Sequence, residues 1–179
     1  MATRHLDIDN TFVIGDNHFF HNNIIKYENR PFNSVDEMNE SMIAQWNSEV
    51  SKKSKIIVCG DWIFGSKANI EAIVPRLNGY KILIIGNHDN YTPRYYNSIG
   101  VEEASNYPIL VNDFLLFSHE PQYINEAMPY INVFAHVHSN PMYKDFSPKS
   151  ACVSAERLGY RPIRLRKIID EVNRLGDLK

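Results

Sequence analysis

Short runs of aliphatic and β-branched residues recur along the chain and are separated by longer mixed or polar segments. Runs of this length and composition are typical of buried β-strands. We therefore expect strands at residues 11–14, 56–59, 82–85, 115–117, 133–135 and 152–153. The run at 82–85, Ile-Leu-Ile-Ile, is apolar at every position, which favours a strand covered on both faces.

Helical periodicity appears between these runs. Ser34 followed by Glu37 forms a capping box, which predicts a helix start. Apolar residues then recur every three or four positions up to Val50, so one face of this helix should pack on a sheet. Shorter patterns at 70–77, with a proline as a local flaw, and at 168–175 predict two more helices.

The order of these elements bears on the fold class. Strands alternate with helices in the first part of the chain, which indicates an α/β layered architecture. From Ile109 onward the chain is rich in strands and leaves little room for helices, so we expect part of the sheet structure to be antiparallel. A length of 179 residues fits one compact domain.

Composition narrows the class of protein. Apolar residues make up 44% of the chain and charged residues 22%, and the formal net charge is -2 with no long basic run. Tight binding to a long polyanion needs many neutralised phosphates, so we expect no extended nucleic-acid binding. No apolar stretch approaches the ~20 residues that span a bilayer, so no membrane association is expected.

Two further features point to a cytoplasmic location. Residues 1–10 are polar and lack the apolar core of a signal peptide. Cys59 and Cys152 lie far apart, each within an apolar run, and we expect buried thiols rather than a disulfide. The sequence does not indicate an oligomeric state.

Candidate chemistry follows the predicted strands. Five strands in succession are followed by Asp, His or Asn. These segments are Gly15-Asp16-Asn17-His18, Gly60-Asp61, Gly86-Asn87-His88-Asp89, Ser118-His119 and His136-Val137-His138. Each alone could be a turn or a helix cap, but five such segments in register with five strands are not a coincidence. Open α/β sheets place ligand crevices at these strand ends, so we expect one polar cluster there.

The spacing within two of these segments suggests how they contribute. Residues i and i+2 of an extended segment point to the same side. We therefore expect Asp16 with His18, and His136 with His138, to face one cavity.

The five segments resemble, in order, the motifs of the calcineurin-like metallophosphoesterase family: Asp-x-His, Gly-Asp, Gly-Asn-His-Asp/Glu, a single His and His-x-His. They span Asp16 to His138. The stretch from His18-Phe19-Phe20-His21 to Asn29-Arg30-Pro31-Phe32 also resembles a small bacterial and phage branch of that family. The resemblance implies one metallophosphoesterase domain over residues 1–179, folded as a four-layer α-β-β-α sandwich with two mixed β-sheets flanked by helices.

The same resemblance implies two divalent metal ions per chain. Asp16, His18 and His138 bind the first ion, Asn87, His119 and His136 bind the second, and Asp61 bridges them. We expect manganese, with iron, zinc or nickel as alternatives, because imidazole and carboxylate ligands suit all four. Two carboxylates against four positive charges leave the centre positive, which attracts phosphate and lowers the pKa of a bridging water.

Four further residues are candidates for catalysis or substrate binding. The resemblance makes His88 the group that protonates the leaving oxygen or hydrogen-bonds the phosphoryl oxygens. Asp89 either orients His88 or caps a loop. Arg30 either forks onto a phosphate or lies exposed at the surface. His21 either faces the cavity or caps the following helix.

A departure from the resemblance bears on the substrate. Protein Ser/Thr phosphatases of this superfamily continue Gly-Asp into a stretch ending Asp-Arg-Gly, whose Arg grips a phosphomonoester, but here residues 62–66 contain no Arg. We therefore expect a phosphodiesterase that hydrolyses a nucleotide-like or small organic diester by in-line attack of a metal-bridging hydroxide. The alternatives are a phosphomonoesterase acting on mononucleotides or phosphoproteins and, more remotely, a non-catalytic protein-binding scaffold.

Overall fold

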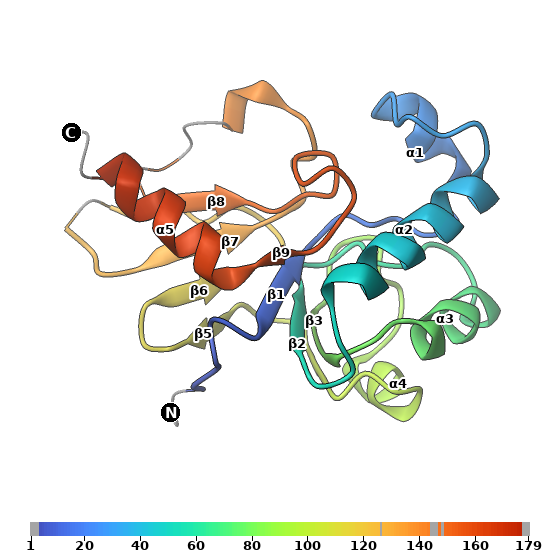
Figure 1. Cartoon of the computed structure of the whole chain (residues 1–179), viewed down its shortest axis with the longest axis horizontal. Coiled ribbons are helices and arrows are strands. Elements are labelled where there is room, and N and C mark those ends of the chain that lie inside the picture. Colours follow the sequence, from blue (N-terminus) through green and yellow to red (C-terminus); the bar gives the residue numbers. More distant parts are fainter. Residues whose placement is uncertain (1–3, 126, 144–146, 148, 177–179) are drawn as a thin grey trace.

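The computed structural model describes residues 4–125, 127–143, 147 and 149–176, which form two β-sheets (Figure 1). The first sheet has the order β4-β3-β2-β1-β9. Its strands are β1 (Thr11–Ile14), β2 (Lys55–Val58), β3 (Tyr80–Ile84), β4 (Glu103–Ser105) and β9 (Ile163–Arg164). Strands β1 to β4 are parallel, and β9 is antiparallel to β1.

The second sheet has the order β5-β6-β7-β8. Its strands are β5 (Ile109–Val111), β6 (Leu115–Phe117), β7 (Ile131–Phe134) and β8 (Ser150–Cys152). Strands β6, β7 and β8 are parallel, and β5 is antiparallel to β6. The predicted α/β sandwich with two mixed sheets is therefore confirmed.

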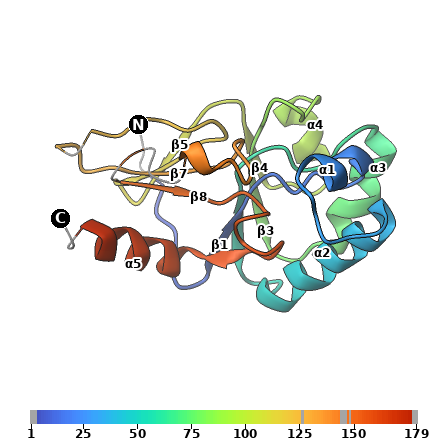
Figure 2. The same ribbon diagram turned by 90° about the horizontal axis from the view of Figure 1, so that it is seen from above.

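The helices are distributed unevenly over the two sheets. They are α1 (Asn22–Tyr27), α2 (Val35–Glu49), α3 (Lys67–Ile73), α4 (Pro93–Ser98) and α5 (Leu165–Gly176), with short 3₁₀ turns at Val74–Arg76 and Pro141–Tyr143. Figure 2 shows α1 to α4 together on the side of the first sheet, and α5 beside the second sheet.

Local sequence signals account for the helix boundaries. The Ser34 side chain accepts a hydrogen bond from the Glu37 backbone N–H, as the capping box predicts. The Glu37 carboxylate instead accepts from the backbone of Asn33, one residue before the cap. The helix predicted over 70–77 ends as α3 at Ile73, and the segment with Pro75 continues as a 3₁₀ turn.

The central strands β1, β2 and β3 are covered on both faces. In β2, for example, Ile56 and Val58 belong to the core beneath α2 and α3, whereas Ile57 belongs to the core between the two sheets. All three side chains are fully buried, and each such burial stabilises the fold by about 1.5–3 kcal/mol. This two-sided burial explains why the strands are almost continuously apolar in sequence.

Helix α5 completes the core between the sheets. It contacts β1, β8 and β9, and its buried residues Leu165, Ile168 and Val172 pack with the inward faces of both sheets. Among the described residues, no helix has the length and apolar character needed to cross a bilayer. Cys59 is buried and Cys152 half-buried, and both are free thiols.

Candidate metal centre

The seven predicted metal ligands lie together at the carboxyl ends of the strands. Asp16, Asp61 and Asn87 follow β1, β2 and β3, and His119 follows β6 of the other sheet. His136 and His138 follow β7, the next strand of that sheet. Because parallel strands end at the same edge, the facing sheets bring these loops into contact.

The first group of ligands is Asp16, His18 and His138. One ligand atom from each lies within 4.8 Å of the other two. Among the described residues, neither carboxylate oxygen of Asp16 nor Nε2 of His18 has a hydrogen-bond partner, although all three atoms are buried. Buried polar atoms are nearly always paired, so these unpaired atoms fit a bound cation.

The second group of ligands is Asn87, His119 and His136. Asn87 Oδ1 lies 2.9 Å from His119 Nε2 and 3.0 Å from His136 Nδ1, and the two imidazole nitrogens are 3.1 Å apart. His119 Nδ1 is 2.8 Å from the carbonyl oxygen of Cys59, to which it donates. His119 Nε2 therefore carries a lone pair, and it points at the Asn87 oxygen and the His136 nitrogen.

Asp61 lies between the two groups. Its Oδ2 is 3.5 Å from Nε2 of His18, in the first group, and its Oδ1 is 3.5 Å from Nε2 of His119, in the second. A carboxylate that presents one oxygen to each group has the position that a ligand shared by two cations requires. The residues therefore fit two divalent cations, and their mixture of imidazole, carboxylate and amide ligands suits Mn, Fe, Zn or Ni.

The ligand loops are not extended, contrary to our expectation. Asp16, His18, His136 and His138 have φ angles of 51°, 52°, 70° and 50°, in the left-handed region, and Asp61 has a φ of 49°. Tight left-handed turns, and not the i and i+2 positions of an extended strand, therefore bring these side chains together. Left-handed backbone costs a non-glycine residue about 1–3 kcal/mol and clusters at functional sites.

Two glycines let the ligand loops pack closely. A Cβ at Gly86 would lie 2.3 Å from Asp61 Oδ1, and one at Gly60 would lie 2.5 Å from His119 Nδ1. Any side chain at either position would displace a ligand. This close approach is the physical reason for glycine in Gly60-Asp61 and Gly86-Asn87.

Burial sets the protonation of the ligands. Burial lowers the pKa values of His18 and His119, so both imidazoles are neutral, the form that binds metals. Burial also raises the pKa of Asp16 to about 7. A cation at this carboxylate would reverse that shift, because it favours the charged form.

His88 and His21 lie beside the first group. The rings of His88 and His18 have centroids 5.4 Å apart, and the His88 backbone N–H donates to Asp61 Oδ1. His21 Nδ1 is 3.2 Å from His18 Nδ1, and its ring stacks on Phe64. His21 occupies the N-cap position of α1 but makes no side-chain cap hydrogen bond, so of its two predicted roles the one facing the cluster fits better.

Asp89 caps a loop. Its carboxylate accepts hydrogen bonds from the backbone N–H groups of Asp61, Trp62 and Gly86. These bonds tie the loop after β2 to the loop after β3. Backbone N–H groups therefore occupy both carboxylate oxygens of Asp89. The alternative in which Asp89 orients His88 is wrong.

Arg30 is buried rather than directed at a substrate. Its guanidinium donates to the backbone carbonyls of Asp16 and Asn17 and to the carboxylate of Glu156, and its side chain is 0% exposed. The prediction that Arg30 forks onto a phosphate is therefore wrong, and so is the alternative of an exposed arginine. Arg30 instead holds the backbone of the first ligand loop.

Sequence reasoning missed Glu156. Its Oε1 lies 3.2 Å from Nδ1 of His138 and 2.5 Å from Arg30 Nη2, and its side chain is 5% exposed. Burial alone would lower the pKa of His138, but the hydrogen bond to Glu156 and the charges of Asp16 and Glu156 raise it. Glu156 comes three residues after the sixth predicted strand, at 152–153. Its position near a strand end is the sequence signal that points to it.

The fold and this cluster define a class of protein: a two-sheet α/β sandwich with Asp, Asn and His side chains gathered at its strand ends. The chain is 34% identical to the uncharacterized protein MJ1445 of Methanocaldococcus jannaschii over 164 residues, or 88% of each chain. It belongs to the same family as that protein.

A solved structure extends the comparison of folds. The crystal structure of the protein of unknown function AQ665 from Aquifex aeolicus matches with a TM-score of 0.69 and covers 89% of this chain and 97% of its own. At 21% identity, this likeness shows a shared fold. No protein-family model matches the sequence.

Proposed function

We propose that this chain is a phosphodiesterase of the calcineurin-like metallophosphoesterase type that uses two divalent metal ions. The observation that carries the proposal is the position of Asp61, with one oxygen 3.5 Å from His18 Nε2 and the other 3.5 Å from His119 Nε2. One carboxylate shared between two groups of imidazole, carboxylate and amide ligands is the arrangement that a two-metal hydrolase needs.

The charge balance supports a phosphate substrate. Asp16 and Asp61 are the carboxylates of the two ligand groups. Of the carboxylates beside them, Glu156 is paired with Arg30, Glu28 accepts hydrogen bonds from Ser139, and Asp89 accepts from backbone N–H groups. Two bound cations therefore leave the site positive. When bound, such cations grip the phosphoryl oxygens and lower the pKa of a shared water toward neutrality.

The protein's own residues supply positioning and a proton. His88 lies beside the first ligand group, and its backbone N–H bond to Asp61 fixes the loop that carries it. His88 is exposed, so its imidazole can reach a substrate oxygen. In this proposal His88 gives a proton to the leaving oxygen of the ester.

The nearby arginines already donate hydrogen bonds to protein acceptors, which favours a phosphodiester substrate. Arg30 and Arg157 both contact the ligand loops, but they donate to backbone carbonyls of Asp16, Asn17, His138 and Asn140, and to Glu156. Arg30 is therefore unavailable to fork onto a dianionic phosphomonoester, and the Nε and Nη2 atoms of Arg157 are already occupied by carbonyl oxygens. A diester carries one charge on the reacting phosphate and needs less cationic help.

The test is a side-by-side assay of bis(p-nitrophenyl) phosphate and p-nitrophenyl phosphate, with Mn, Fe, Zn, Ni or Mg added. We expect metal-dependent turnover that favours the diester. A preference for the monoester would support the phosphomonoesterase alternative. Two equivalents of metal bound without turnover of either ester would support a binding protein, for which no observation here argues.

A further inference from the structure

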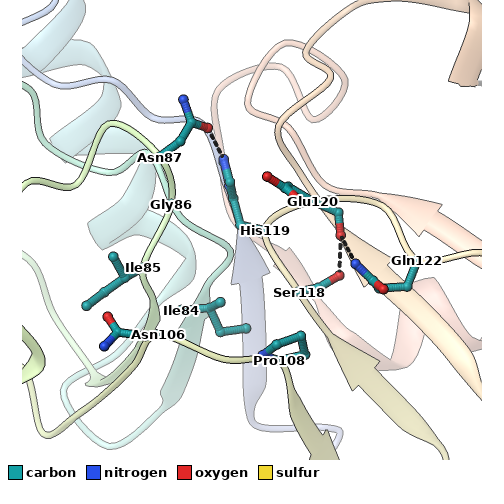
Figure 3. A pocket seen from close by; sticks show the side chains of 10 residues that line it. All are labelled: Ile84, Ile85, Gly86, Asn87, Asn106, Pro108, Ser118, His119, Glu120 and Gln122. Atoms are coloured by element: carbon teal, nitrogen blue, oxygen red, sulfur yellow. Dashed lines mark hydrogen bonds between the residues drawn. The ribbon is translucent and has the colours of Figure 1, made fainter.

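A pocket of about 330 Å³ opens beside the second ligand group, between the loop after β3 and the loop after β6 (Figure 3). Its lining residues come from both sheets: Ile84, Ile85, Gly86, Asn87, Asn106, Pro108, Ser118, His119, Glu120 and Gln122. Two of them, Asn87 and His119, are also candidate metal ligands. An organic group bound in this pocket would therefore lie next to a phosphate bound at the metal ligands.

The pocket carries little charge. Among the residues that the structure describes, no Lys or Arg lines it, and Glu120 is its one carboxylate. Beyond the proposed metal ligands, a second phosphate would meet no described basic side chain there and would face the Glu120 carboxylate instead. The pocket is therefore unsuited to a polyphosphate or to the continuing backbone of a nucleic acid strand.

The rest of the lining suits an uncharged group with a flat or apolar face. Ile84, Ile85 and Pro108 provide apolar surface, while the amides of Asn106 and Gln122 can each donate and accept hydrogen bonds. Small-molecule sites combine apolar walls with a few placed polar groups. The volume lies near the lower end of the ~300–1,000 Å³ range of such sites, which fits a single nucleoside-sized group.

We propose that this pocket binds one organic group of the phosphodiester substrate, and that this group is uncharged and hydrogen-bonding, as a nucleoside is. The inference rests on the proposed phosphodiesterase function and adds to it a substrate class. Asn106 and Gln122 are then specificity residues, which contact the organic group and not the reacting phosphate.

The test compares three chromogenic diesters with the metal-loaded enzyme: thymidine 5′-(p-nitrophenyl phosphate), bis(p-nitrophenyl) phosphate and p-nitrophenyl phosphorylcholine. The variants are Asn106→Ala and Gln122→Ala. The matched control is Asn97→Ala, an exposed asparagine on α4. Thermal unfolding of each variant checks that the fold is intact.

We expect the wild-type enzyme to prefer the thymidine ester. Each pocket variant should raise KM for that ester about fivefold, the loss expected for one neutral hydrogen bond, and leave bis(p-nitrophenyl) phosphate within twofold. Equal effects on both esters, or preference for the choline ester, would overturn the pocket assignment while the phosphodiesterase proposal stands. A wild-type enzyme inactive on all three esters would overturn the phosphodiesterase proposal itself.

A second measurement is independent of catalysis. Thymidine added to the metal-free protein should shift the side-chain amide NMR signals of Asn106 and Gln122, and should not shift that of Asn97. Shifts of similar size at all three residues would overturn the assignment, because they would indicate non-specific contact.

Discussion

Oε1 of Glu156 lies 3.2 Å from Nδ1 of His138, and the same oxygen accepts hydrogen bonds from the buried guanidinium of Arg30. A metal-binding histidine commonly donates its second ring N–H to a carboxylate, which fixes the tautomer and raises the basicity of the ligand nitrogen. Glu156 occupies this position for His138. The hydrogen bond to His138 and the charge of Arg30 lower the pKa of the Glu156 carboxyl against the effect of burial.

Glu156→Gln should weaken binding at the first metal site. A neutral amide holds the His138 tautomer less firmly and leaves the buried Arg30 without its counter-charge, so we expect a loss of ~10–100-fold in affinity for one of two Mn²⁺ equivalents. Isothermal titration of Mn²⁺ into the metal-free protein measures both sites.

The control for this variant is Glu28→Gln. Glu28 lies near His138 and Glu156, but its carboxylate accepts hydrogen bonds from Ser139. This substitution removes the same charge from the same neighbourhood. Equal losses in the two variants would show a general electrostatic effect and would remove the positioning role of Glu156.

Asp61→Asn should weaken both metal sites together. Its two oxygens face different ligand groups, so removing the charge affects each site, whereas a ligand of one group affects one site. Elemental analysis after dialysis against Mn²⁺ should give far fewer than two equivalents. Asp113→Asn, at an exposed turn, should retain two. Full retention in Asp61→Asn would exclude a bridging role.

The hydrophobic pattern was sufficient to predict the buried strands. Strands β1 and β6 begin and end where the sequence predicts, and the other predicted strands are shifted by at most two residues. The strands that were missed, β4, β5 and β9, are two or three residues long. Each lies at a sheet edge and is partly exposed. Strands β4 and β9 carry no apolar run, whereas β5 is Ile-Leu-Val, a run of only three residues.

The candidate ligands could be located from sequence because each follows a strong strand signal. The residues that hydrogen-bond to those ligands could not be located from sequence. They lie far from the ligands along the chain and become neighbours only when they are buried in the fold. Arg30 and Glu156 are 126 residues apart and meet only in the folded chain. The left-handed turns at Asp16 and His138 carry only a weak sequence signal, since Asp and His adopt this conformation more often than most residues but far less often than glycine.

His88→Ala should leave both metal sites filled and lower kcat by ~10²–10⁴, the usual contribution of a general acid. His88 supplies only a backbone N–H to Asp61, and that contact survives the substitution. The loss should be smaller for p-nitrophenyl esters, whose leaving group is acidic, than for alkyl esters. An equal loss for both leaving groups would assign His88 to phosphate binding instead of proton transfer.

The stability of the metal-free protein should depend on pH through the buried carboxylate of Asp16. Burial raises the pKa of Asp16 from 3.8 to about 7. The folded state therefore binds this proton more tightly than the unfolded state, and the contribution of Asp16 to the free energy of unfolding falls as pH rises from about 4 to 7. The difference of roughly three pKa units sets an upper limit of about 4 kcal/mol on this loss.

Asp16→Asn removes this titration, so in the presence of EDTA the variant should gain stability relative to wild type as pH rises from 5 to 8. Urea unfolding at both pH values measures the difference, and Asp170→Asn, exposed on α5, should show no such change. Saturating Mn²⁺ should reverse the order at pH 8, because the cation stabilises only the chain that keeps the carboxylate ligand. A stability difference between Asp16→Asn and wild type that is independent of both pH and Mn²⁺ would mean that Asp16 is neither a strained buried carboxylate nor a metal ligand.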